Sequence, residues 1–65
     1  MLKYPNITVK LTGGSGNAMA IVAKVQAALR KGKVPGTEID AFVSDALSGN
    51  YDHVLRTALN WVDVA

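Results

Sequence analysis

One segment of the chain alternates apolar and polar side chains as a β-strand does, and a single strand constrains the fold because it needs a hydrogen-bonding partner. In residues 6–12, Ile7, Val9 and Leu11 are separated by polar side chains, the period-two pattern of a strand with one buried face. The other region rich in strand formers is residues 61–64. We predict that these two segments pair within the chain. The alternative is that residues 6–12 pair with their copy in a second chain.

Three amphipathic helices are predicted between these two segments. Apolar side chains recur every three or four residues in residues 17–31 and 37–47, and a third helix is expected to begin near Tyr51. One N-terminal strand followed by three short helices gives an α+β fold, with a short C-terminal edge strand in the pairing that we prefer. Residues 1–65 are expected to form a single small domain, because domains hold about 50 residues or more.

Cap residues indicate where the helices begin and end. Ser15 or Asn17 can accept a hydrogen bond at the start of the first helix. Gly32 is the expected residue beyond its end, because glycine readily adopts the left-handed conformation found there. Thr37 is the expected N-cap of the second helix, with Asp40 three residues on, a variant of the capping box.

The chain has 65 residues, of which 49% are hydrophobic, and no cysteine. A disulfide scaffold and a cysteine-ligated zinc module are therefore excluded. No segment has the apolar run of a signal peptide or approaches the ~20 apolar residues of a membrane-spanning helix, so we expect a cytoplasmic protein with no membrane partner. A domain this small has marginal stability, for which a partner chain can compensate, so a homo-oligomer is also expected.

A glycine-rich turn between the predicted strand and the first helix is the main candidate for ligand binding. Backbone N–H groups and the positive end of a helix dipole hold phosphates in such a place. The dinucleotide fingerprint is incomplete, because Met19 stands at its third glycine position, and no P-loop sequence follows. The turn is either a tight connection or a site for a phosphorylated small molecule, completed by a basic residue of a neighbouring chain. The candidate ligand-binding residues are Gly14, Ser15, Gly16, Asn17 and Lys31.

Charge is divided between the two halves of the chain. Residues 1–33 hold six basic and no acidic side chains, a charge of +6, whereas residues 34–65 hold Arg56 and five acidic side chains, a charge of −4; together they give the net +2. This division fits a basic surface for a phosphate-bearing partner, or head-to-tail self-association through opposite faces. It also fits charges that stabilise helix ends without any further role.

Residues that carry chemistry are few in this sequence. His53 is the single histidine, and its neighbour Asp52 points in a different direction on a helix. The chain has no cysteine nucleophile, and no serine stands in the context of a nucleophile elbow. We therefore predict a non-enzymatic protein without a metal or cofactor.

The third helix is a candidate for contact with a partner. It offers only Arg56 and Asn60 for reading base edges, so nucleic acid is not the expected partner. Trp61 is a candidate contact, because so small a domain is not expected to bury it fully. The candidate partner-binding residues are Tyr51, His53, Arg56 and Trp61.

Several short motifs together carry a resemblance that covers nearly the whole chain. They are Tyr4-Pro5, Leu11-Thr12-Gly13, Gly16-Asn17-Ala18, Ala28-Leu29-Arg30, Glu38-Ile39, Ser48-Gly49-Asn50-Tyr51-Asp52-His53 and Trp61-Val62. With them the chain resembles a group of very small uncharacterised proteins of bacteria, phages and mobile elements. The resemblance implies the context of an accessory genome and assigns no functional residue. Small phage accessory proteins are frequently inhibitors or sponges of host defences, and that context is an analogy.

These observations lead to one main functional hypothesis and two alternatives. The main hypothesis is a non-enzymatic, homo-oligomeric accessory protein that binds and neutralises a partner, sequestering a nucleotide-type signal of host defence. The first alternative is an inhibitor that blocks a host protein through a helical face. The second is a small DNA-binding regulator.

Overall fold

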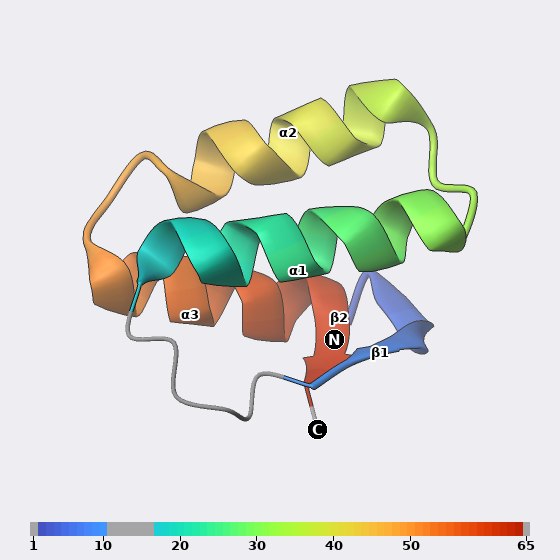
Figure 1. Ribbon diagram of the computed structural model, residues 1–65, viewed down its shortest axis with the longest axis horizontal. Helices are drawn as coiled ribbons and strands as arrows, with labels where there is room; N and C mark the ends of the chain where they lie inside the picture. The colour runs from blue at the N-terminus through green and yellow to red at the C-terminus, as the bar shows by residue number, and fades with distance from the viewer. Residues whose placement is uncertain (1, 11–16, 65) are drawn as a thin grey trace.

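The computed structural model describes residues 2–10 and 17–64, which form two short strands and three helices (Figure 1). In chain order the elements are β1 (Tyr4–Val9), α1 (Ala18–Lys31), α2 (Gly36–Ala46), α3 (Tyr51–Trp61) and β2 (Val62–Val64). The α+β fold class is therefore as predicted. The helices lie side by side, and the strand pair sits below the C-terminal ends of α1 and α3 (Figure 1).

The two strands pair in parallel, which confirms the predicted partner of the N-terminal strand. Tyr4 is aligned with Val62 and Val9 with Val64, with an irregularity in β1 between the two points. The strand begins at Tyr4, two residues earlier than predicted. Pro5 is accommodated inside it because β1 is an edge strand, where a missing N–H leaves no gap in a ladder. The predicted residues 11 and 12 lie outside the described part of the chain.

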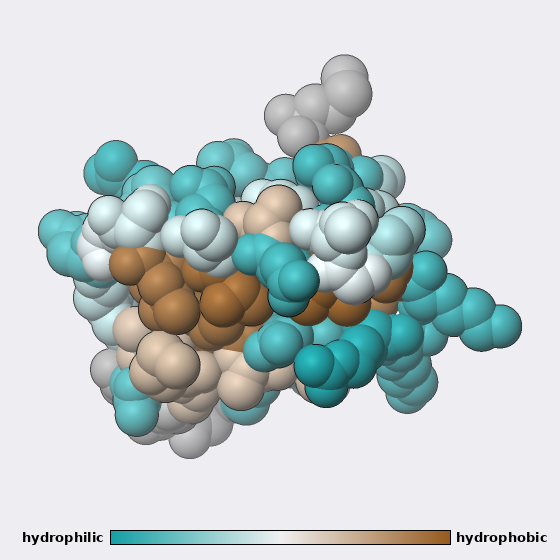
Figure 2. Space-filling model, turned by 90° about the horizontal axis from the view of Figure 1, so that it is seen from above, coloured by the Kyte–Doolittle hydropathy of each residue, from teal (hydrophilic) through white to brown (hydrophobic). Residues whose placement is uncertain are grey.

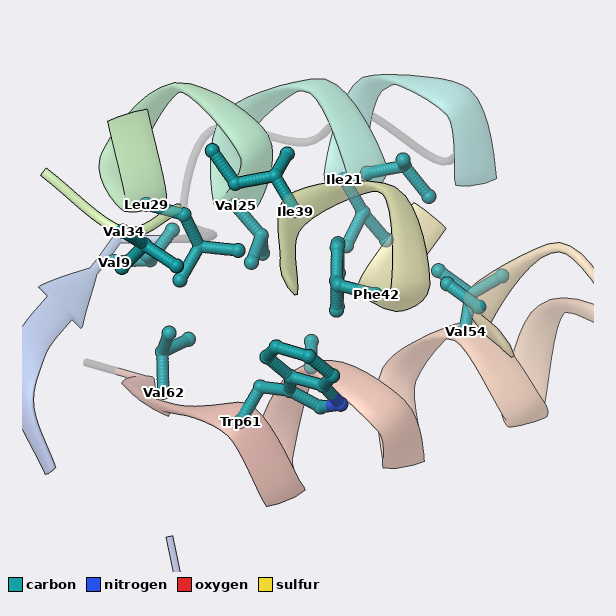
Figure 3. Packing of buried hydrophobic residues seen from close by; sticks show 13 residues of the cluster. Val9, Ile21, Val25, Leu29, Val34, Ile39, Phe42, Val54, Trp61 and Val62 are labelled. Atoms are coloured by element: carbon teal, nitrogen blue, oxygen red, sulfur yellow. The ribbon is translucent and has the colours of Figure 1, made fainter. Parts of the chain in front are cut away.

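The core lies between the three helices and the strand pair (Figure 3). Phe42 of α2 and Trp61 of α3 meet edge to face, with ring centroids 5.4 Å apart, the geometry that the charge distribution of aromatic rings favours. Each fully buried side chain of this size contributes about 1.5–3 kcal/mol through burial. The largest fully buried side chains are Phe42, Leu29, Val25, Val54 and Val62.

Trp61 belongs to the core. It is 8% exposed and is not among the fully buried side chains, as expected for so small a domain, but little of it remains accessible to a partner. Tyr4 of β1 lies against the indole with the ring centroids 5.9 Å apart. The N-terminal segment therefore covers part of a side chain that α2 contacts from another side.

Asn17 caps α1 as predicted. Its side-chain oxygen accepts a hydrogen bond from the N–H of Met19 at 2.9 Å, and its own backbone is extended. The alternative cap, Ser15, lies outside the described residues. Asn50 caps α3 in the same way, accepting from the N–H of His53 at 3.0 Å.

The end of α1 differs from the prediction by one residue. Gly32 has a negative φ of −80° and Lys33 has the positive φ of 62°. The N–H of Lys33 donates to Arg30 O and that of Val34 to Leu29 O, both at 3.0 Å, which is the Schellman pattern. Lys33, and not Gly32, therefore occupies the left-handed position at the end of α1. Gly32 instead lies where β1 approaches the helix. A Cβ at Gly32 would lie 2.8 Å from Cδ1 of Ile7 in β1, so the absence of a side chain lets strand and helix approach closely.

The start of α2 also differs from the prediction. Pro35 is the N-cap, and its carbonyl accepts from the N–H groups of Glu38 and Ile39 at 3.0 and 3.1 Å. Thr37 lies within the first turn, so its assignment as N-cap is wrong. The fixed φ of proline and its missing N–H suit a helix start, and they override the capping preference of the nearby threonine.

Replacing Lys33 with glycine is expected to stabilise the domain by about 1 kcal/mol, because a left-handed conformation costs a side-chain-bearing residue about that much. Thermal or urea unfolding measures the change. Lys31→Gly is the matched control: it removes the same charge inside α1 and is expected to destabilise. If both variants shifted stability in the same direction, the assignment of strain to Lys33 would be wrong.

Candidate functional site

The predicted ligand site is only partly assembled within one chain. Gly14, Ser15 and Gly16 lie outside the described residues. Asn17 stands at the N-terminus of α1, but its side chain occupies the N–H of Met19, one of the donors that an anion would use. Lys31 is the last residue of the same helix, roughly 20 Å away at 1.5 Å per residue. Lys31 therefore cannot join Asn17 around one small ligand unless it comes from another chain.

Asp45, Ser48 and His53 lie together at the connection between α2 and α3. His53 Nε2 is 2.9 Å from the backbone oxygen of Asp45, 3.2 Å from Ser48 Oγ and 3.5 Å from the Asp45 carboxylate. The three residue types are those of a catalytic triad, but in a triad the acid and the nucleophile contact different nitrogens of the ring. Here every partner lies at Nε2, so the cluster cannot relay a proton from serine through histidine to aspartate.

This cluster has a structural explanation at the C-terminal end of α2. The Asp45 carbonyl also accepts the Ser48 hydroxyl at 2.6 Å, and since a carbonyl can only accept, Nε2 of His53 carries the proton in this arrangement. The carbonyl belongs to the last turn of α2, where backbone oxygens lack helical partners. A Cβ at Gly49 would lie 2.7 Å from Cβ and Cγ of His53, so the glycine leaves room for the imidazole.

A second polar cluster joins the N-terminal segment to α2 and α3. Lys3 Nζ lies 2.8 Å from Glu38 Oε1, and its ammonium sits 4.3 Å from the centroid of the Trp61 ring. The Tyr4 hydroxyl donates to the same Glu38 oxygen at 3.3 Å. Local sequence patterns could not predict this cluster, because Lys3 and Glu38 are far apart in the chain.

The pKa values of this cluster follow from its contacts. The hydrogen bond to Glu38 raises the pKa of Lys3, and the hydrogen bond from Lys3 lowers the pKa of the Glu38 carboxyl. Partial burial, together with the Glu38 charge, raises the pKa of the Tyr4 hydroxyl. The shifts of the Lys3 and Glu38 pKa values favour an ammonium and a carboxylate at neutral pH, and the raised pKa of Tyr4 favours its neutral, donating hydroxyl. The cluster is therefore an ion pair that joins the N-terminal segment to α2.

Three residues with exposed apolar side chains stand in the first turns of α1 and α3 and directly after α2. The starts of α1 and α3 and the end of α2 lie at one end of the helical layer (Figure 1). Met19 is 56% exposed, Leu47 45% and Tyr51 41%; we call these three residues the helix-end patch. Viewed from the α2 side, an apolar band runs along the helices to this same end (Figure 2). Helical periodicity predicted Leu47 as core. It is exposed because α2 ends at Ala46, so Leu47 projects beyond the packed turns.

The predicted partner-binding residues do not form one surface. Tyr51 belongs to the helix-end patch, and Arg56 is exposed on the outer side of α3. His53 is half-buried in the cluster with Asp45, and Trp61 is in the core. The structure thus leaves Tyr51 and Arg56 accessible and gives His53 and Trp61 structural contacts.

Other kinds of site are not found in the described part of the chain. Residues 2–10 and 17–64 contain no group of three or more His, Cys, Asp or Glu side chains placed to hold a metal ion, and no pocket. None of the described helices has the length and apolar character needed to cross a membrane.

Comparisons with family models, curated proteins and solved structures give no match for this chain.

Replacing Glu38 with glutamine is expected to lower the free energy of unfolding at pH 7, since the ion pair with Lys3 is lost. The folded-state pKa of Glu38 is below its ordinary 4.5. The Glu38 carboxylate therefore makes its full contribution to the free energy of unfolding above about pH 4.5. This contribution is lost as the pH falls through the folded-state pKa. The stability difference between wild type and Glu38→Gln should shrink below pH 4.5 in urea unfolding measured from pH 7 to pH 2.

Asp40→Asn is the matched control, because it changes an exposed carboxylate of the same helix with no ion pair among the described residues. Its stability difference from wild type is expected to be small at pH 7. A Glu38→Gln difference that stayed constant down to pH 2 would contradict the assigned ion pair.

Proposed function

We propose that this chain is a non-enzymatic accessory protein that acts by binding a protein partner through the helix-end patch. The proposal rests on the exposure of Met19, Leu47 and Tyr51 together with their positions at helix ends that lie at the same end of the helical layer. Large apolar side chains grouped on a surface are typical of protein contact sites, and tyrosine and methionine are enriched in them. Such a site needs no pocket, in keeping with the described residues.

The resemblance to small proteins of bacteria, phages and mobile elements supplies the proposed context. In that setting the bound partner is a host protein, and occupation of its surface is the means of inhibition. The chain is small and has the two polar clusters described above to hold its helices in place, so the patch is presented by a preorganised scaffold. Preorganisation lowers the ordering cost of binding.

Sequestration of a nucleotide-type signal is the second candidate, and it has less support. Asn17 is at the start of α1, and the last turn of the same helix carries basic side chains. However, the cap takes one of the N–H donors, and Lys31 lies at the far end of the helix. A DNA-binding role has the least support, because the outer side of α3 carries Asp52 beside Arg56 and an acidic side chain repels phosphates.

Affinity capture from a bacterial host lysate tests the proposed patch when it is made with matched variants. A protein that co-purifies with wild type should be lost with Leu47→Asp and with Met19→Asp, since a charge in an apolar contact must be desolvated. Ala41→Asp is the control: it adds the same charge to an exposed position of α2 away from the patch and should retain the protein. A captured protein that ignored the Leu47 and Met19 changes, or one lost equally with Ala41→Asp, would refute the patch.

Calorimetric titration with nucleotides tests the second candidate. We expect no binding at about 1 mM nucleotide, where even a millimolar dissociation constant would be detected. Asn17→Ala is expected to destabilise the domain by about 1 kcal/mol through the lost helix cap. Saturable nucleotide binding that Asn17→Ala abolished, while the variant stayed folded, would restore the sequestration hypothesis in place of the helix-end patch.

A further inference from the structure

Two acidic side chains stand next to the helix-end patch in the sequence. Asp45 comes two residues before Leu47, and Asp52 directly follows Tyr51. Both aspartates are exposed, and 56% of the Asp45 side chain is accessible. His53 Nε2 lies 2.9 Å from the backbone oxygen of Asp45, which places the end of α2 beside the start of α3. The two carboxylates therefore belong to the same end of the molecule as the patch.

The segments that form this end contain neither lysine nor arginine. Residues 17–23 and 41–55 hold the two aspartates as their only charged side chains, so with a neutral histidine they carry a charge of −2. The nearest basic residues on α1 and α3 are Lys24 and Arg56, each five residues beyond the patch residue of the same helix, about 7.5 Å along the helix axis. One end of a chain with a net charge of +2 is thus locally acidic.

This local charge determines which kind of partner surface fits the patch. The border of a protein interface is polar and accessible to solvent, and opposite charges across it steer the two proteins together. At physiological salt, charges act over about 8 Å. The basic last turn of α1 begins at Arg30, roughly 16 Å along the helix from Met19, so its effect on this end is screened. Nucleic acid and anionic lipid present phosphates, which the carboxylates repel.

We infer that the helix-end patch fits a protein surface whose apolar centre is bordered by lysine or arginine side chains, which pair with Asp45 and Asp52. This inference rests on the proposed function, because it names the chemistry of the partner at the same site. Exposed ion pairs contribute little affinity each. The apolar side chains of the patch therefore supply most of the affinity, and the two carboxylates select the partner by its charge.

Two synthetic amphipathic helical peptides test the inference. Both carry leucine on one face, and the other face carries lysine in one peptide and glutamate in the second, so they differ in charge alone. The lysine peptide is expected to bind about fivefold more tightly at low salt, and this ratio should fall towards one in 1 M salt, where charges act over about 3 Å. NMR titration of the isotopically labelled protein measures both dissociation constants and follows the methyl signals of Met19 and Leu47.

Charge variants assign the preference to the two aspartates. Asp45→Asn combined with Asp52→Asn removes both charges with little change in size, and this variant should lose its preference for the lysine peptide. Asp45→Lys combined with Asp52→Lys should prefer the glutamate peptide. Asp40→Asn removes an exposed carboxylate nearer the start of α2 and is the matched control, which should keep the wild-type ratio. Thermal unfolding checks each fold. Because lysine is unfavourable in the first turn of α3, the asparagine pair decides the test if the lysine pair does not fold.

The outcomes separate the inference from the proposed function. If both peptides moved the Met19 and Leu47 signals and the lysine peptide bound no more tightly than the glutamate peptide, the inference would be overturned and the helix-end patch would stand. A preference for the lysine peptide that persisted in the asparagine pair would also overturn it, since other charges would then be responsible. If neither peptide moved those signals, the patch itself would be wrong, and the inference with it.

Discussion

The parallel pairing of β1 with β2 is the constraint on which the rest of the structure depends. Two parallel strands cannot be joined by a tight turn, because both must begin at the same end of the strand pair. The chain that leaves the end of β1 must therefore return to the end at which β1 began before β2 can start. In this protein all three helices lie within that connection. β2 follows α3 directly, so the pairing ties the end of α3 to the N-terminal strand, and the helices fill the space between with the apolar side chains of the core.

The N-terminal ion pair completes what the strand pairing begins. Lys3 contacts Glu38 of α2 and the ring of Trp61 in α3, so one side chain joins the first residues of the chain to two helices. Tyr4 adds a hydroxyl contact to Glu38 and a ring against the indole. This arrangement explains how a domain without cysteine buries most of its tryptophan, and it leaves the helix-end patch accessible.

Much of the fold could be predicted from the sequence, because periodicity and capping are local signals. The alternation through Ile7 and Val9, the cap at Asn17 and the apolar repeat of α2 each act within a few residues. The predicted start of α2 and the predicted end of α1 were each wrong by one or two residues, because neighbouring residues had a stronger effect on the backbone than the expected cap. Pro35 displaced Thr37 as the start of α2, and Lys33 took the left-handed position, whereas Gly32, with a negative φ, lies where Ile7 of β1 approaches.

The candidate sites were less predictable for the same reason. Which apolar side chains remain exposed depends on where each helix stops and on what covers it, as Leu47 shows. The grouping of Met19, Leu47 and Tyr51 joins three elements and has no signature within any one of them.

The separation of the paired strands along the chain has a kinetic consequence. Tyr4 and Val62 are partners, so their pairing closes a loop that holds nearly the whole domain, and the entropy of closing a loop rises with its length. Folding rates fall as contacts become more distant in sequence. The helices can form and meet early, whereas the strand ribbon joins only after they have brought the two ends together. Amide protons of the ribbon should therefore exchange through openings that leave the helical core closed.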